Sequence, residues 1–151
     1  MSGSRGFLLD TNIVLHATRA DSKLSAAIDA QFDLTNSRFR PAICEVSVGE
    51  LLAFTRSERW GEKRKELLRE KINGTLIVPI SYPGIHERWA EMSSSLRTAG
   101  ISIGQNDIWI AATASVAGMT LLTTDKDFST LKRAISLEVC VLDNRTGLPI
   151  P

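Results

Sequence analysis

The chain has 151 residues and a mass of 16.6 kDa, the size of a single domain with one core. Its composition, 43% hydrophobic and 23% charged, excludes a disordered or fibrous protein, and a net charge of +1 excludes a polycation that wraps nucleic acid by bulk charge alone. The two cysteines, Cys44 and Cys140, form no C-x-x-C pair, which excludes a disulfide framework and a cysteine-rich zinc site. No stretch has the length and apolarity of a membrane span, and the first residues lack a signal-peptide pattern, so we expect a cytoplasmic protein.

The hydrophobic pattern predicts short strands that alternate with longer helices. The predicted strands are residues 6–10, 39–43, 76–80, 119–124 and 137–142. The predicted helices are residues 11–18, 22–34, 45–57, 62–73, 84–99 and 104–117. This alternation indicates an α/β fold with a mainly parallel sheet and helices on both faces. We expect one domain over residues 1–151, with residues 1–5 disordered and residues 144–151 forming an irregular tail.

Individual residues indicate several of the predicted boundaries. Ser22 is a suitable N-cap for the second helix, and Ser102–Gln105 has the spacing of a capping box before the most apolar helix. Gly118 is placed to end that helix. Pro79 has no backbone N–H to donate, so the strand that contains it is expected near an edge of the sheet.

Two acidic residues directly follow predicted strands. Asp10 ends the first apolar run, and Asp125 follows the strand that ends at Thr124. The ends of parallel strands gather along one rim of a sheet, where ligands bind in open α/β folds, so the two carboxylates meet if their strands are neighbours. Taken alone, each aspartate is better explained as the cap of the helix that follows it.

Two further acids lie on apolar helices. Asp107 is followed by the sequence IWIAA in the most apolar helix, and Glu50 lies within VSVGELL. A buried carboxylate is unfavourable without hydrogen-bond partners or a metal ion. Each acid also has a structural explanation: Asp107 suits the positive end of a helix dipole, and Glu50 suits an exposed position or a salt bridge.

As a set, Asp10, Glu50, Asp107 and Asp125 are poorly explained by four separate structural roles. Carboxylates held at one point repel each other, and a cation is needed to keep all of them ionised. An all-oxygen ligand set suits Mg²⁺ or Mn²⁺, which keep several waters and bind substrate phosphates. Such a centre polarises a phosphoryl group and activates water, so we predict chemistry on a phosphodiester.

Four motifs follow one another along the chain: LLDTN from Leu8, SVGEL from Ser47, NDIWIAA from Asn106 and LTTDKDF from Leu122. In this order and spacing they resemble the PIN-domain ribonucleases, and most closely their VapC-type bacterial toxins, over nearly the whole chain. The resemblance implies a three-layer α/β/α sandwich. It also implies a metal-dependent endoribonuclease that hydrolyses RNA phosphodiester bonds as the toxin of a toxin–antitoxin pair.

The resemblance also implies which residues form the site. The four acids would be the catalytic residues and the ligands of Mg²⁺ or Mn²⁺. Five further positions match the family's supporting residues: Thr11 and Asn12 after the first acid, Asn106 beside Asp107, Thr124 beside Asp125, and Asp127 as a fifth acid where family members vary.

Two kinds of protein partner are implied by the resemblance: a second copy in a homodimer, and a cognate antitoxin whose C-terminal segment enters the active-site groove. The basic segment of residues 58–71, which includes Trp60, is compatible with an antitoxin or RNA surface. Its glutamates recur every four residues, however, which is more typical of a solvated helix face. Trp89, Met92 and Leu96 lie at helical spacing and suit either dimer contacts or core packing.

Two other functions stay open from the sequence: a non-catalytic RNA-binding or interaction module of the same fold, and a metal-dependent DNA nuclease. The complete acidic set argues against the first, and a comparison of RNA with matched DNA separates the second. The two histidines, His16 and His86, have no zinc-binding spacing, and the chain has no glycine-rich phosphate loop. A histidine-rich zinc enzyme, a dinucleotide-binding protein and a P-loop hydrolase are therefore disfavoured.

Overall fold

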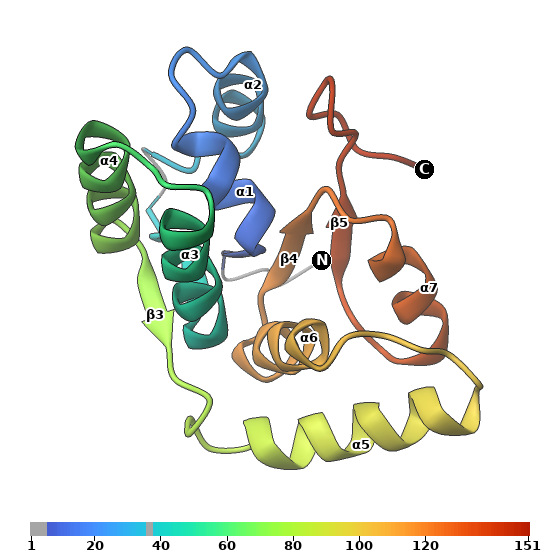
Figure 1. Ribbon diagram of the computed structural model, residues 1–151. Coiled ribbons are helices and arrows are strands. Elements are labelled where there is room, and N and C mark those ends of the chain that lie inside the picture. Colours follow the sequence, from blue (N-terminus) through green and yellow to red (C-terminus); the bar gives the residue numbers. More distant parts are fainter. Residues whose placement is uncertain (1–5, 36–37) are drawn as a thin grey trace.

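The computed structural model describes residues 6–35 and 38–151 and shows helices packed around a central sheet (Figure 1). The predicted disorder of residues 1–5 lies outside the described residues. The strands are β1 (Phe7–Leu9), β2 (Ala42–Cys44), β3 (Leu76–Val78), β4 (Thr120–Thr123) and β5 (Val139–Val141). The helices are α1 (Thr11–Ala17), α2 (Lys23–Phe32), α3 (Glu45–Ser57), α4 (Glu62–Asn73), α5 (Ile85–Thr98), α6 (Gln105–Ala117) and α7 (Asp127–Ala134). Within the described part of the chain, no helix is long and apolar enough to cross a membrane.

The strands pair in parallel throughout, in the order β3-β2-β1-β4-β5. From β1 the chain builds outward through β2 to β3, and it then returns to the other side of β1 to add β4 and β5. The direction of building reverses between β1 and β4, and such a reversal is where ligands bind in α/β sheets. β3 lies at an edge, as Pro79 predicts, and the predicted parallel sheet is confirmed.

Successive residues of a strand point to opposite faces of the sheet, and here both faces are buried. Leu8 and Leu121 belong to a core cluster with residues of α5, α6 and α7, whereas Leu9 and Leu122 belong to a second cluster with residues of α1, α2, α3 and α4. Each of these leucines stabilises the fold by about 2 kcal/mol through burial. Helices on both faces are therefore required, and the expected three-layer α/β/α sandwich is confirmed.

The apolar stripe on α5 is explained by packing within one chain. Met92 is fully buried and Leu96 is 2% exposed, both in the core cluster that includes α6. Trp89 stacks on Trp109 of α6 with 5.0 Å between the ring centroids. Of the two interpretations that the sequence leaves open for this stripe, core packing is the one that the structure bears out.

The ends of the helices agree with the sequence in two places and differ in a third. The hydroxyl of Ser22 accepts a hydrogen bond from the backbone N–H of Ser25 at 3.1 Å and caps α2. Gly118 ends α6 in the left-handed conformation, with φ of 66°. The predicted capping box before α6 is wrong, because Gly104 is the N-cap and no side chain caps the helix there. Ser102 lies too early in the chain to reach the first turn.

Two further differences concern β2 and α7. The second strand begins at Ala42 and not at residue 39, because Phe39 is 52% exposed and the exposed Arg40 donates instead to the carbonyl oxygens of Asn73 and Thr75 at 2.8 Å and 3.1 Å. The short helix α7, residues 127–134, is not predicted by the sequence pattern. Among the residues of α7 whose burial the structure describes, only Phe128 and Leu131 are buried, too few for a clear helical period.

The C-terminal tail is irregular, as predicted, but it is attached to the domain. The backbone N–H of Ile150 donates to the carbonyl oxygen of Val141 at 2.8 Å, and the side-chain amide of Gln31 donates to the carbonyl oxygen of Gly147 at 2.8 Å. Gly147 is buried at this contact and has φ of 74°. The tail therefore contacts α2 through Gly147, and Ile150 packs against the core cluster that contains Leu8 and Leu121.

Substitution of Gly147 tests this docking. An added Cβ would lie 3.0 Å from Cγ1 of Ile28 and 3.3 Å from Cδ1 of Leu24, at a φ that L side chains rarely adopt. Gly147→Ala is therefore expected to lower the free energy of unfolding by roughly 1–3 kcal/mol in urea denaturation. The control Gly49→Ala, in α3 with nothing within 4 Å of the added Cβ, is expected to be neutral or stabilising. An unchanged free energy of unfolding for Gly147→Ala would contradict the docked tail.

Candidate active site

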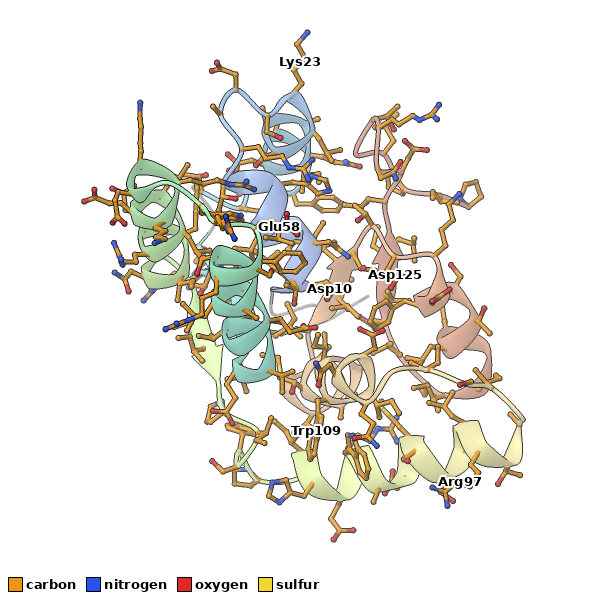
Figure 2. All side chains as sticks on the ribbon, in the orientation of Figure 1. Asp10, Lys23, Glu58, Arg97, Trp109 and Asp125 are labelled. Atoms are coloured by element: carbon orange, nitrogen blue, oxygen red, sulfur yellow. The ribbon has the colours of Figure 1, made fainter. Side chains whose placement is uncertain are left out.

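The ends of β1 and β4 bring Asp10 and Asp125 to one rim of the sheet, as the sequence predicts. Leu9 pairs with Leu122 in the parallel ladder, and the backbone N–H of Asp10 donates to the carbonyl oxygen of Leu122 at 2.9 Å. Figure 2 shows Asp10 and Asp125 at neighbouring positions at the reversal point between β1 and β4. Asp10 is also the N-cap of α1. Asp125 precedes Lys126, the N-cap of α7, and accepts a hydrogen bond from the backbone N–H of Asp127 at 2.9 Å.

Asp10 is a buried carboxylate with three donors. Its Oδ1 accepts from the backbone N–H of Thr11 at 2.8 Å, and its Oδ2 accepts from the Thr123 hydroxyl at 2.6 Å and from the Asn12 amide at 3.1 Å. Burial raises the pKa of Asp10, the donors oppose that rise, and neighbouring carboxylates add to it. The side chain is 4% exposed, so its two oxygens are held in fixed directions.

Thr123 is a site residue that the sequence analysis missed in favour of Thr124. The fully buried Thr123 hydroxyl donates to Asp10 and accepts from the backbone N–H of Asp125 at 2.9 Å. Thr124 contributes its backbone N–H, which donates to the Asn12 amide oxygen at 3.1 Å. The sequence did carry a signal for Thr123: it is a polar residue at the end of a strand that is buried on both faces, where a hydroxyl needs a hydrogen-bond partner.

Asn12 links the two strand ends, and its supporting role in catalysis stays a prediction. Its amide nitrogen lies 3.1 Å from Oδ2 of Asp10 and 3.3 Å from the Thr123 hydroxyl, and its oxygen accepts from the backbone of Thr124. One of these contacts is to the residue that follows β1, and the other two are to residues at the end of β4. The direction of the Asp10 carboxylate is therefore set by both strands together.

Glu50 reaches the same rim from α3. The Thr11 hydroxyl donates to its Oε1 at 2.7 Å and lies 3.0 Å from the hydroxyl of the fully buried Ser47. The Asn106 amide donates to Oε2 of Glu50 at 3.4 Å. This differs from the sequence-based expectation that Asn106 supports Asp107. The reason is the packing of α6 against α3, which turns Asn106 toward α3. Within the described residues Glu50 forms no salt bridge.

Asp107 has the most strongly perturbed pKa of the site. It lies half-buried in the first turn of α6, and burial together with surrounding carboxylates raises its pKa to about 7. The carboxylates that contribute, after burial, are Asp10, Asp125, Glu50 and Asp127. The favourable helix dipole is therefore outweighed at Asp107, where burial and the four neighbouring carboxylates act in the same direction.

The chemistry of the donors fits a hard divalent cation. The rim offers carboxylate, hydroxyl and amide oxygens, and burial together with the neighbouring carboxylates makes the ionised form of Asp107 unfavourable without a cation. Within the described residues, no three of these side chains converge on a point where one ion would contact all of them. Ligation of Mg²⁺ or Mn²⁺ by Asp10, Glu50, Asp107 and Asp125 therefore stays a prediction.

Metal binding is expected to raise the melting temperature, and to do so more at about pH 8 than at about pH 6. Asp107, with a pKa of about 7, is mostly ionised at the higher pH, where a cation relieves the most repulsion. A metal concentration of 100 times the Kd would stabilise the fold by about 2.7 kcal/mol. The measurement is a thermal melt with Mg²⁺ or Mn²⁺ against K⁺ at equal ionic strength. Equal melting temperatures at saturating divalent ion would contradict a shared metal site.

A sequence profile described as the PIN domain matches residues 7–134, a range that contains all five acids of the rim. The chain belongs to the PIN-domain family. This PIN domain is 27% identical over 132 residues to Ribonuclease VapC5 of Mycobacterium tuberculosis, covering 87% of the chain and 92% of that protein. A stretch of 47 residues is 43% identical to Ribonuclease VapC4 of the same organism and covers 31% of the chain and 36% of VapC4.

Solved structures agree with the fold. The PIN domain superposes on a chain of VapBC2 from Rickettsia felis with a TM-score of 0.78 and 24% identity, covering 91% of this chain and 99% of that one. It superposes on a chain of VapBC-1 from nontypeable Haemophilus influenzae with a TM-score of 0.73 and 20% identity, covering 90% and 97%. The predicted membership of the family and the predicted architecture are both confirmed.

Proposed function

We propose that this PIN domain is a metal-dependent endoribonuclease and the toxin of a toxin–antitoxin pair. The observation that carries the proposal is the rim of mutually repelling carboxylates around Asp107, at the reversal point of the sheet. Asp10, Glu50, Asp107 and Asp125 are the residues that would hold Mg²⁺ or Mn²⁺. The bound ion would supply the charge that activates water and stabilises the phosphoryl group.

The surrounding side chains give the carboxylates fixed directions before any ligand binds. Thr123 and Asn12 hold Oδ2 of Asp10, and Thr11 and Asn106 hold the two oxygens of Glu50. Because these contacts join the end of β1 and the start of α1 with β4, α3 and α6, the site depends on segments far apart in the chain. Such preorganisation reduces the free energy needed to arrange the charges during reaction.

RNA is the proposed substrate because two relatives carry the name ribonuclease VapC. The test is cleavage of a mixed RNA panel and of matched DNA by purified protein, with Mg²⁺ or Mn²⁺ against chelator. Asp10→Asn is expected to remove cleavage, and the control Asp33→Asn, at an exposed residue after α2, is expected to retain it. RNA bound but uncut would favour the non-catalytic module, and DNA cut in preference to RNA would favour a DNA nuclease.

An antitoxin partner is proposed because the structural neighbours are VapBC complexes, one of them described as bound to promoter DNA. A small adjacent gene for a DNA-binding protein would support it. We also propose a homodimer. The edge strand β3 exposes Leu76 and Ile77 by 45% and 46%, as in a surface that a partner covers. Light scattering of the purified protein distinguishes the dimer from a 16.6 kDa monomer.

A further inference from the structure

A strongly basic hollow of about 650 Å³ lies between the C-terminal half of α3 and α4. Four cationic side chains line it, Arg56, Arg59, Lys65 and Arg69, and no acidic side chain does. The chain as a whole has a net charge of only +1, so this concentration of one sign is local. Figure 1 shows α3 and α4 next to each other, on the side of the molecule away from α7.

Only part of the charge on α4 faces the hollow. Lys65 and Arg69, one turn apart, line it, whereas Glu66 and Glu70 line a different surface together with Lys63 and Arg64. The sequence favours a solvated face for this segment, and the surface of mixed charge that carries Glu66 and Glu70 fits that description. The basic face does not, because it opposes the cations of α3 across a concave surface.

The guanidinium groups of the hollow are left without acidic partners. Within the described residues Arg56, Arg59 and Arg69 form no salt bridge. Lys65 lies 3.3 Å from Glu62, whose side chain is 84% exposed, so that pair is screened by solvent. Three unpaired cations facing one cavity repel each other and favour the binding of an anion.

Arg59 occupies this surface in an unfavourable backbone conformation. The N–H of Trp60 donates to the carbonyl oxygen of Thr55, and the N–H of Arg59 donates to that of Arg56, the pattern of a Schellman motif at the end of α3. Glycine is the usual residue at this position, yet Arg59 adopts φ of 48° there. An arginine in the left-handed region costs on the order of 1 kcal/mol in free energy of folding. Its side chain nevertheless lines the hollow.

The hollow is separate from the acidic rim but within a short distance of it. Arg56 follows Glu50 by six residues in α3, which places it about 9 Å along the helix axis and about 120° around it. The carboxylates and the guanidinium groups therefore face different directions. A chain of phosphates that passes the rim and continues over α3 meets both.

We propose that this hollow binds phosphates of the RNA substrate at a distance from the bond that is cut, an inference that rests on the proposed ribonuclease function. Guanidinium groups bind phosphate with two parallel hydrogen bonds. Trp60 is unavailable for stacking on a base, because it is 8% exposed and Arg64 lies 3.6 Å from its ring centroid. The hollow therefore contributes affinity that is independent of base sequence.

The test compares two triple variants in an Asp10→Asn background that does not cut RNA. One carries Arg56→Gln, Arg59→Gly and Arg69→Gln. The matched control removes three exposed cations elsewhere: Lys23, Arg97 and Arg145, each changed to Gln. Figure 2 shows Lys23 and Arg97 far from α3, at the ends of α2 and α5. The measurement is fluorescence anisotropy of a labelled, mixed-sequence single-stranded RNA of about 20 nucleotides over a range of salt concentrations.

The hollow variant is expected to bind RNA on the order of 10- to 100-fold more weakly, with a slope of log Kd against log salt smaller by about 2. The control is expected to stay close to the parent. Arg59→Gly removes the backbone strain, so thermal melting is expected to show an intact fold. Equal losses in both variants, or equal displacement of RNA by polyglutamate and by unlabelled RNA, would overturn the proposal.

The experiment distinguishes failure of the phosphate site from failure of the proposed ribonuclease function. If the wild-type protein cuts RNA with metal while the hollow variant binds as tightly as its parent, the ribonuclease stands and the phosphate site is wrong. If the parent binds no RNA and the wild type cuts none, both proposals are wrong.

Discussion

Asp107→Asn is expected to reduce metal-dependent RNA cleavage by on the order of 10³-fold or more while leaving the fold intact. Asp107 is the carboxylate on which all the other acids of the rim act, and it lies half-exposed in the first turn of α6. An amide keeps the shape of the side chain but removes the charge that would bind a cation. Initial rates on a cleaved RNA from the panel measure the effect.

The same variant has an opposite effect on the stability of the metal-free protein. The pKa of Asp107 is raised from 3.8 to about 7, so folding favours the protonated acid. The stability that protonation provides is complete below pH 3.8 and is lost as the pH rises through about 7. Asp107→Asn carries no such penalty, and its melting temperature is expected to exceed that of the wild type at about pH 8 but not at about pH 4.

The matched control for both measurements is Asp33→Asn, the same chemical change at an exposed residue outside the rim. It is expected to leave the cleavage rate and the pH dependence of melting unchanged. A fully active Asp107→Asn protein would remove Asp107 from the mechanism. A melting temperature that responds to pH identically in wild type and variant would contradict the raised pKa.

Thr123→Val is expected to lower the free energy of unfolding by roughly 2–4 kcal/mol and to impair cleavage. The substitution keeps the volume of a fully buried side chain but removes the 2.6 Å donor to Asp10 and the acceptor for the backbone N–H of Asp125. The backbone N–H of Asp125 then loses its acceptor, and the buried Asp10 carboxylate loses the shortest of its three donors. Urea denaturation and the cleavage rate measure the two effects.

Thr124→Val is the matched control, because the neighbouring threonine takes part through its backbone N–H, which valine retains. Its effect on the free energy of unfolding is expected to be within about 0.5 kcal/mol. If Thr124→Val were the more damaging substitution, the hydroxyl that supports the site would be that of Thr124, as the sequence predicts, and not that of Thr123.

Local patterns were sufficient to predict most elements of this domain. The bounds predicted for α3 and α4 agree with the structure, and the edge position of β3 follows from Pro79. The four principal acids could be selected from the sequence because two follow strands directly and two lie on apolar helices. A buried carboxylate is unfavourable without hydrogen-bond partners or a metal ion, and four separate structural roles explain the set poorly. The helix α7 and the start of β2 were not predicted correctly, because each depends on few buried residues or on contacts with distant segments.

The sequence by itself determined the alternation of strands and helices, the family and the acids at strand ends, since these depend on residue type and on spacing along the chain. Only the tertiary structure decided which hydroxyl contacts Asp10 and which acid Asn106 contacts. The tertiary structure was also needed to show that cations of α3 and α4 line the same hollow. Such contacts join residues far apart in the chain, and a one-residue change in register turns a different side chain toward the site.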